Sequence, residues 1–362
     1  MKTKKNVLHL VEYLYLGGIE RLLEQLAIHS KEDVNLFYFT YETTELNGIG
    51  KNIAELGLPV FTFKKSPGTD WNLFKSLVSI IQAHKIQVIH THDFGPMEYA
   101  FLLKIRFPWV KLVHTQHTMH HFVIKAKYRY FFQLSSYFYS SIIGVSQYVV
   151  DLIKQECPLT NPFALKVIYN GVDTNIYKRS EICLDIHRLN LVNVARISPE
   201  KNFEYILNTC LLLQNAGIPF ILHHAGTGSK PHLLESYVRF INDNKLSDKV
   251  ILHGYINEAK KILDMGDIFV TSSKREGHPV ALLEAMSCEK LCLCSDIAPH
   301  RETVDGKVYL FDLNDEMALF EQLVKIYNSN RNLNESRADI RNVIIDKYSI
   351  EIMVHAYGEI YG

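Results

Sequence analysis

The stretch FVTSSKREGHPVALLEAMS, residues 269–287, combines an apolar strand, a short polar loop and a helix. The loop carries Gly277, and Pro279 suits the first turn of a helix because its missing N–H group would have no partner there. Residues 280–287 are good helix formers. A strand that passes directly into a helix is typical of a parallel sheet, and the helix N-terminus then favours phosphate at the carboxyl edge of that sheet.

The same alternation of strands and helices extends in both directions from this stretch. Apolar runs predict strands at 7–11, 34–40, 60–63, 88–92, 111–115 and 142–145, and again at 189–194, 220–224, 250–253, 268–272 and 291–294. Helical spacing at 19–29, 73–84 and 203–216 falls between them. Strands that alternate with helices predict parallel sheets covered on both faces. The fold class is therefore α/β, with two doubly wound, Rossmann-like domains.

The boundary between the two domains falls in a polar segment with the turn signal Asn170-Gly171. We predict a first domain at 1–170, a linker at 171–186 and a second domain at 187–345. Residues 348–361 predict an amphipathic helix at the end of the chain.

Composition limits the classes of function. Lys plus Arg and Asp plus Glu both count 39, so the formal net charge is zero. This balance gives no indication of a nucleic-acid partner. The six cysteines are too few and too unevenly placed for a disulfide framework, which favours a reducing, cytoplasmic compartment. Cys292 and Cys294 alternate within a predicted strand and are expected in the core, with metal or redox chemistry as the alternative. No apolar run approaches a membrane span, so any membrane contact would be peripheral.

Two glutamates flank the start of the helix in the opening stretch. Glu276 precedes it and Glu284 follows about two turns in. A carboxylate can accept hydrogen bonds from vicinal hydroxyl groups, so this spacing suits a sugar at one end of a diphosphate and a ribose at the other. Glutamates eight residues apart are also common without any such role.

Two cations follow another predicted strand, in VARISPEKNF. Arg196 and Lys201 would neutralise the charge that grows on a leaving diphosphate, which stabilises a transition state. A solvated pair of loop residues is the alternative. Gly226 and Gly228 in HHAGTGS resemble part of a dinucleotide fingerprint that lacks its third glycine. Gly17 and Gly18 lie between the first strand and the first helix, where backbone can approach a phosphate or sugar, although a tight turn explains them as well.

The segment HTQHTMHH, residues 114–121, raises the question of a metal site. Its spacing does not converge on one ion and no glutamate completes a known zinc motif, so we predict no metal. His117, at the end of a predicted strand, is better placed to hydrogen-bond a substrate hydroxyl group.

Residues 122–140, which begin at Phe122 and end at Ser140, hold eight aromatic residues and the cations Lys125, Lys127 and Arg129 without any acid. Residues 1–140 contain 16 Lys plus Arg and 11 Asp plus Glu. A surface that faces anionic lipid would show this asymmetry. A helix whose aromatic side chains lie in the core is the alternative.

The order of these motifs resembles a known family. GGIER, a histidine at a strand end, NGVD, RISPEKN, AGTG, HGY and EGHPVALLEA follow one another as in the retaining glycosyltransferases of family 4, which have the GT-B fold, two such domains facing a central cleft. The resemblance covers nearly the whole chain, and its most specific part is Glu276-x7-Glu284.

The resemblance implies roles for these residues. It implies a hexosyltransferase in which Arg196 and Lys201 bind the donor diphosphate, Glu284 the ribose and Glu276 the transferred sugar, with His117 near that sugar. The donor site would include Gly17, Gly18, Gly226, Gly277, His278, Val280 and Ala281. The resemblance also implies independence of metal and a nucleotide-sugar donor, with a UDP-sugar favoured. A final helix that crosses back to the first domain is implied as well.

One departure from the family pattern concerns the turn. His278-Pro279 stands where Phe-Gly or a similar pair is usual, and proline removes a backbone N–H group from the donor site.

The expected acceptor is a glycan or a lipid-linked sugar in assembly of capsule, O-antigen or exopolysaccharide. Alternatives are a non-catalytic nucleotide- or carbohydrate-binding module, an epimerase or a phosphorylase.

Overall fold

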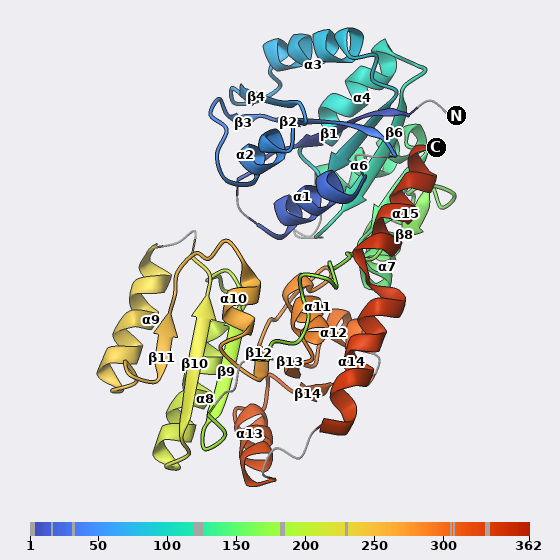
Figure 1. Cartoon of the computed structure of the whole chain (residues 1–362). Coiled ribbons are helices and arrows are strands. Elements are labelled where there is room, and N and C mark those ends of the chain that lie inside the picture. Colours follow the sequence, from blue (N-terminus) through green and yellow to red (C-terminus); the bar gives the residue numbers. More distant parts are fainter. Residues whose placement is uncertain are drawn as a thin grey trace. The chain divides into compact units, whose positions relative to one another are not determined.

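A computed structural model of the chain describes residues 4–15, 17–30, 33–118, 126–181, 185–228, 231–304, 306, 308–329 and 334–362. It divides into two compact units (Figure 1). The first unit comprises Met1–Gly171 and Ile350–Gly362, and the second comprises Val172–Ser349. The second unit is thus inserted, in sequence, into the first.

The first unit is built on a sheet with the strand order β3-β4-β2-β1-β5-β6-β7-β8. All neighbouring strands are parallel except β3 and β4, which are antiparallel. From the central β1 the chain builds outward through β2 on one side and β5 on the other, so the strand order reverses between β1 and β5. The strands are β1 (Asn6–Val11), β2 (Asn35–Thr40), β3 (Glu42–Thr43), β4 (Val60–Lys64), β5 (Val88–His92), β6 (Lys111–Gln116), β7 (Ser141–Gly144) and β8 (Leu165–Val167).

Helices cover both faces of this sheet because alternate strand residues point in opposite directions. Val7 and Tyr38 pack with one group of helices, and Leu8 and Phe39 with the other. The first group is α1 (Gly18–Ser30), α2 (Gly48–Glu55) and α15 (Ile350–Tyr361); the second is α3 (Trp71–Ala83), α4 (Met97–Arg106), α6 (Ala126–Ser135) and α7 (Gln147–Glu156). A short 3-10 helix, η1 (Ser136–Phe138), follows α6.

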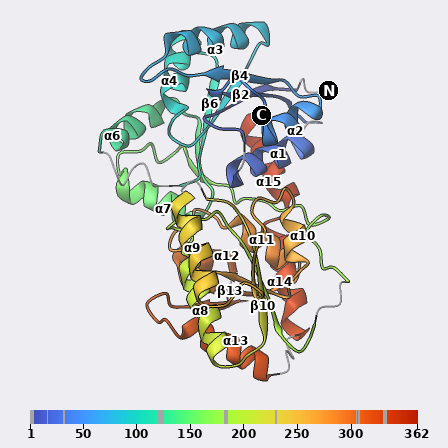
Figure 2. The same ribbon diagram turned by 90° about the vertical axis from the view of Figure 1, so that its left-hand side faces the viewer.

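The second unit has a fully parallel sheet in the order β11-β10-β9-β12-β13-β14, which reverses between β9 and β12. The strands are β9 (Leu189–Val194), β10 (Phe220–Ala225), β11 (Val250–Leu252), β12 (Ile268–Thr271), β13 (Leu291–Ser295) and β14 (Tyr309–Phe311). Helical layers lie on both sides of this sheet (Figure 2). The helices are α8 (Phe203–Asn215), α9 (Pro231–Asp243), α10 (Ala259–Leu263), α11 (Val280–Ser287), α12 (Ala298–Val304), α13 (Ala318–Asn328) and α14 (Asn334–Lys347).

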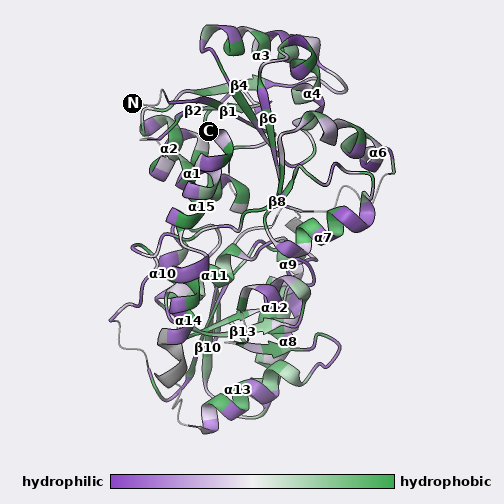
Figure 3. Cartoon of the chain, turned by 90° about the vertical axis from the view of Figure 1, so that its right-hand side faces the viewer, coloured by the Kyte–Doolittle hydropathy of each residue, from purple (hydrophilic) through white to green (hydrophobic). Residues whose placement is uncertain are grey.

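The α/β class and the doubly wound sheets are confirmed. Each strand predicted from an apolar run is present, with ends that differ by at most one residue. The outer helices α3 and α13 carry both hydrophilic and hydrophobic segments, as expected for helices with one face on a sheet (Figure 3). Cys292 and Cys294 are completely buried, as predicted for core residues.

The helix predicted over 348–361 is present as α15, which begins two residues later, at Ile350. Two helices, α14 and α15, are separated by Tyr348 and Ser349, and Ser349 forms a bridge with Val172 instead of continuing a helix. Both residues are buried in the second unit, whereas α15 packs on the first. The start of the segment assigned to the linker is held on the second unit as well, since Arg341 donates to the carbonyl oxygens of Thr174 and Tyr177.

Candidate active site

The candidate site of the second unit lies where the strand order reverses. The strands β9 and β12 pair only through Leu191 and Val192, and their chains then diverge at the carboxyl edge of the sheet. Asn193 bridges this point, because its side-chain N–H group donates to the carbonyl oxygen of Val270 at 2.7 Å. A crevice at the carboxyl ends of strands that leave a parallel sheet in opposite directions is where ligands bind in such folds.

Lys201 and Glu276 form an ion pair across this reversal point. Lys201 follows β9 and Glu276 follows β12, and Nζ lies 2.5 Å from Oε1. The side chains are 24% and 13% exposed, respectively. The loop that carries Lys201 is fixed to β12, because Ser272 Oγ donates to the carbonyl oxygen of Asn202 at 2.8 Å. The backbone N–H group of Lys274 also donates to the carbonyl oxygen of Glu200.

The surroundings of Glu276 keep its carboxylate charged. Burial by itself raises the pKa of Glu276, but the charge and hydrogen bond of Lys201, with smaller contributions from His300 and Ser273, bring the pKa below its ordinary value. His300 is buried, and its Nδ1 contacts the carbonyl oxygen of Ser295 at 2.8 Å. The site therefore contains a negative and a positive charge at neutral pH, both largely shielded from water.

Helix α11 begins beside this pair. The amide groups of Leu282 and Leu283 already donate to the carbonyl oxygen of Pro279, whereas the first N–H groups of a helix, here those of Val280 and Ala281, have no acceptor in a preceding turn. Pro279 precedes the helix as its N-cap residue instead of standing in its first turn. Glu284 lies within α11 and is half-buried.

His278 points into the protein. It is buried, its ring lies 5.2 Å from that of Tyr348, and burial lowers its pKa to about 3 despite the opposing charge of Glu276. At neutral pH it is an uncharged packing residue of the turn, and it adds no positive charge to the site. Gly277 next to it is buried as well.

Gly226 lies in the loop directly after β10, which is the second loop of the candidate site. Its φ is +147°, and a Cβ atom there would lie 1.8 Å from the carbonyl oxygen of Ala195, so no other residue fits. The close contact of Gly226 with Ala195 and the bridge between Ile197 and Gly228 hold the loops after β9 and β10 together. Arg196 leaves this junction and is exposed; within the described ranges it has no ion-pair partner. The structure thus brings Lys201 and Glu276 together and leaves Arg196 unattached.

The remaining predicted residues lie in the first unit, at the carboxyl edge of its sheet. Gly17 lies between β1 and α1 and Gly18 begins α1, and a Cβ atom on Gly18 would meet nothing within 4 Å. His117 directly follows β6 and is 6% exposed. Its backbone N–H group donates to Oδ1 of Asp93 at 3.0 Å, which fixes the backbone directly after β6. Of the other histidines in HTQHTMHH, His114 is a core residue, and His120 and His121 lie outside the described residues.

Two family models match the chain, one in each unit. The model of glycosyltransferase family 4 matches residues 16–176, and that of glycosyl transferases group 1 matches residues 187–344. The chain is a glycosyltransferase, with a family 4 domain followed by a group 1 domain. It is an enzyme of the GT-B fold, as predicted.

Relatives of this glycosyltransferase cover nearly all of its length. The UDP-Gal:alpha-D-GlcNAc-diphosphoundecaprenol alpha-1,3-galactosyltransferase of Escherichia coli is 23% identical over 99% of this chain and 97% of its own. HepE from Anabaena, solved in complex with UDP and glucose, has a TM-score of 0.84 with 17% identity, and the match covers 98% of both chains. A glycosyltransferase from Rickettsia africae has a TM-score of 0.83 with 16% identity, over 99% and 98% of the two chains.

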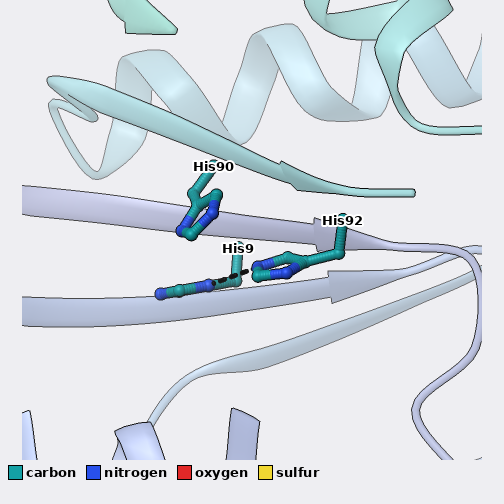
Figure 4. Close-up of side chains that lie close together, drawn as sticks. All are labelled: His9, His90 and His92. Carbon is teal, nitrogen blue, oxygen red and sulfur yellow. Dashed lines mark hydrogen bonds between the residues drawn. The ribbon is translucent and has the colours of Figure 1, made fainter. Parts of the chain in front are cut away.

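Sequence reasoning missed several residues around the site of this glycosyltransferase. Ser272 and Asn193 position the two loops of the ion pair, and they resemble ordinary polar residues at strand ends. In the first unit, His9, His90 and His92 cluster from β1 and β5 (Figure 4). They alternate with apolar residues, so they were included in predicted strands; only the pairing of β1 with β5 brings them together.

Proposed function

We propose that this glycosyltransferase transfers a hexosyl group from a nucleotide diphosphate sugar to a glycan or a lipid-linked acceptor, with retention of anomeric configuration, in bacterial surface polysaccharide synthesis. The ion pair of Lys201 and Glu276 at the strand reversal is the observation that carries the proposal. Lys201 would supply the cation for a diphosphate and Glu276 the carboxylate for a sugar, and the two side chains are hydrogen-bonded to each other. The charges are shielded from water, which strengthens their effect on a transition state.

Each residue of the second unit has a role in the proposal. Lys201 has three N–H donors, so it can keep its bond to Glu276 and still donate to a diphosphate oxygen. The start of α11 presents N–H groups to the same oxygens. Arg196, exposed and unattached, has freedom to close on the diphosphate from the other side. Glu276 would then accept a hydroxyl group of the transferred sugar, and Glu284, two turns along α11, those of the ribose.

Independence of metal is part of the proposal. In many transferases a divalent cation balances the diphosphate charge, and here Arg196, Lys201 and the N-terminus of α11 could supply that balance. Retention would follow if the acceptor attacks on the face that the leaving phosphate occupies. His117 in the first unit would contact the transferred sugar.

The nature of the acceptor is proposed from the relatives and from the first unit. The E. coli relative is named for a diphosphoundecaprenol acceptor, and another is named an O-antigen biosynthesis glycosyltransferase. In the first unit, a hollow of about 280 Å³ beside the loop after β1 is lined by Tyr13, Tyr15, Glu42 and Glu45, among others. Aromatic faces next to carboxylates suit a sugar with several hydroxyl groups.

A thermal-shift screen tests the donor site. We expect one of UDP, GDP and ADP, with UDP favoured, to raise the melting temperature in the presence of EDTA, because a ligand that binds only the folded state stabilises it by about 2.7 kcal/mol at a hundred times its Kd. The shift should be much smaller in Glu284→Ala and Arg196→Ala. Arg239→Ala, an exposed arginine of α9, is the matched control and should keep the full shift. A shift that appears only after addition of Mg²⁺ or Mn²⁺ would contradict metal independence.

We further propose that the first unit docks on an anionic membrane through one exposed surface, named here the α6 surface. Phe132 and Tyr139 of the predicted segment are core residues, but other apolar side chains around α6, η1 and the neighbouring loop are exposed: Tyr130, Leu134, Tyr137, Phe138, Leu159 and Phe163. Lys127 adds a positive charge, while Arg129 is paired with Glu156 at 3.0 Å. Lys125 lies outside the described residues. No helix in the described ranges is long and apolar enough to cross a bilayer.

Sedimentation with liposomes that contain anionic lipid tests the α6 surface. We expect the double variant Leu134→Ser, Phe163→Ser to lose most of its binding, because it removes inserted apolar area. Lys127→Gln should weaken binding about fivefold, since one cation near an anionic surface contributes about 1 kcal/mol, and the effect should disappear in high salt. Trp71→Ser, at an exposed tryptophan of α3, is the control. Equal sedimentation of all variants would remove the membrane proposal.

A further inference from the structure

Three histidines of the first unit form a continuous hydrogen-bonded relay. His9 Nδ1 lies 3.0 Å from His92 Nε2 (Figure 4), and His92 Nδ1 lies 3.2 Å from His117 Nε2. The three residues come from β1, β5 and the end of β6, which are adjacent strands. The relay therefore runs across the strand reversal of the first sheet, from a fully buried ring to the loop at its carboxyl edge.

All three rings are neutral, so the protons of the relay are coupled. Burial lowers the pKa of His9 and of His117 to about 3 and holds that of His92 well below its ordinary value. A neutral imidazole has one N–H donor and one acceptor nitrogen. Both N···N contacts must therefore be polarised in the same direction. His117 either donates from Nε2 and keeps an acceptor at Nδ1, or accepts at Nε2 and carries its proton on Nδ1.

The buried end of the relay decides between these directions. His9 Nε2 is buried without a hydrogen-bond partner among the described residues. Buried N–H groups without an acceptor are rarer in proteins than acceptors without a donor, so the unpaired atom should be the bare nitrogen. His9 then donates from Nδ1 to His92, and His92 donates from Nδ1 to His117. The proton of His117 is thereby placed on Nδ1, which has no partner within the described part of the chain but, unlike His9 Nε2, is not one of the fully buried atoms.

A metal site is the other chemistry that this region suggests. His9, His90 and His92 have ring nitrogens within 4.8 Å of one another. Both ring nitrogens of His90 are already engaged, with Tyr361 Oη at 2.7 Å and Thr115 Oγ1 at 2.8 Å. An ion would have to break these bonds and the bond between His9 and His92, with no carboxylate in the group to balance its charge. The hydrogen-bonded relay explains the geometry better.

We propose that His9 and His92 are positioning residues that fix His117 as the Nδ1-protonated tautomer, which makes Nδ1 a hydrogen-bond donor to an oxygen of the transferred sugar. The inference rests on the proposed function for the contact between His117 and the sugar. The tautomer itself rests only on the geometry of the relay. Asp93 supports the arrangement, because its bond to the backbone of His117 keeps the ring next to His92.

The tautomer is measured by long-range ¹⁵N–¹H NMR on the full chain with labelled histidine, without any donor present. We expect His117 to carry its proton on Nδ1. His92→Leu should remove this preference, since it fills the space without a hydrogen bond. His92→Asn should restore it, because the Asn side-chain N–H group can occupy the place of Nδ1 and donate to His117. In steady-state assays His92→Leu should lower kcat about tenfold with little change in the donor KM, and His92→Asn should recover most of it.

A matched control and the contrary outcomes separate the relay from a structural effect. His90→Phe also removes a buried histidine, and it should lower the melting temperature while His117 keeps its tautomer. An Nε2 proton on His117 in the wild type would overturn the inference, as would Zn²⁺ that binds the wild type and shifts the signals of His9 and His92. If the tautomer is as expected but His117→Ala retains full activity, the relay stands and the role given to His117 in the proposed function fails.

Discussion

Lys201→Met should lower kcat by about 10²- to 10³-fold while the protein stays folded. That is the typical loss when one preorganised group that stabilises developing charge is removed. The change leaves Glu276, only 13% exposed, without its partner, so we also expect a loss of about 2 kcal/mol in the free energy of unfolding. Steady-state kinetics and denaturant unfolding measure the two effects separately.

A double variant distinguishes catalysis from stability. Lys201→Met with Glu276→Gln removes the stranded carboxylate, so stability should return towards the wild type while activity stays low. Lys274→Met is the matched control, because Lys274 is an exposed cation on the loop that also carries Glu276. Near-normal kcat in Lys201→Met, with the variant folded, would contradict the role given to the ion pair.

The dependence of stability on pH follows from the pKa of Glu276. In the wild type this pKa is below its ordinary value of 4.5, so the pair stabilises the protein above pH 4.5 and the contribution is lost as the pH falls through the folded-state pKa. Without Lys201, burial dominates and raises the pKa, so the charged carboxylate destabilises the variant at neutral pH. The difference in unfolding free energy between the two proteins should therefore shrink as the pH is lowered.

Removal of residues 350–362 should prevent the first unit from folding cooperatively. Helix α15 buries Ile350, Met353, Tyr357, Ile360 and Tyr361 in the core of that unit. Each such side chain contributes about 1.5–3 kcal/mol, so the total approaches the whole stability of an ordinary domain before the entropy cost is subtracted. The deletion also removes the hydrogen bond between His90 and Tyr361 and the one between Thr115 and Tyr357. Differential scanning calorimetry should show that only the transition of the second unit remains.

Two point variants in α15 give reference values for the loss of stability that the deletion causes. Tyr361→Phe removes only the hydrogen bond to His90 and should cost about 1 kcal/mol. Ile352→Ala, at a residue of α15 that is 43% exposed, should change little. Two normal calorimetric transitions after the deletion would mean that α15 is not required for folding of the first unit.

Local patterns were sufficient to predict the strands, the start of α11 and the positions of Lys201 and Glu276 at strand ends. Their contact was not predictable in this way, because it depends on β9 and β12 becoming neighbours although the two residues are 75 positions apart. The same holds for His9 and His92, which are 83 positions apart and alternate with apolar core residues. The inward orientation of His278 depends on Tyr348, a residue in the break between two helices that the helical pattern did not reveal.

The order in which the chain is synthesised has a consequence for the first unit. Its sheet is complete after Gly171, yet α15, which covers one of its faces together with α1 and α2, is made only after another 178 residues, those of Val172–Ser349, have left the ribosome. The inserted second unit is continuous and can fold as soon as it emerges. We therefore expect the part of this face that α15 covers to stay exposed during synthesis, so that the first unit completes its fold after the second.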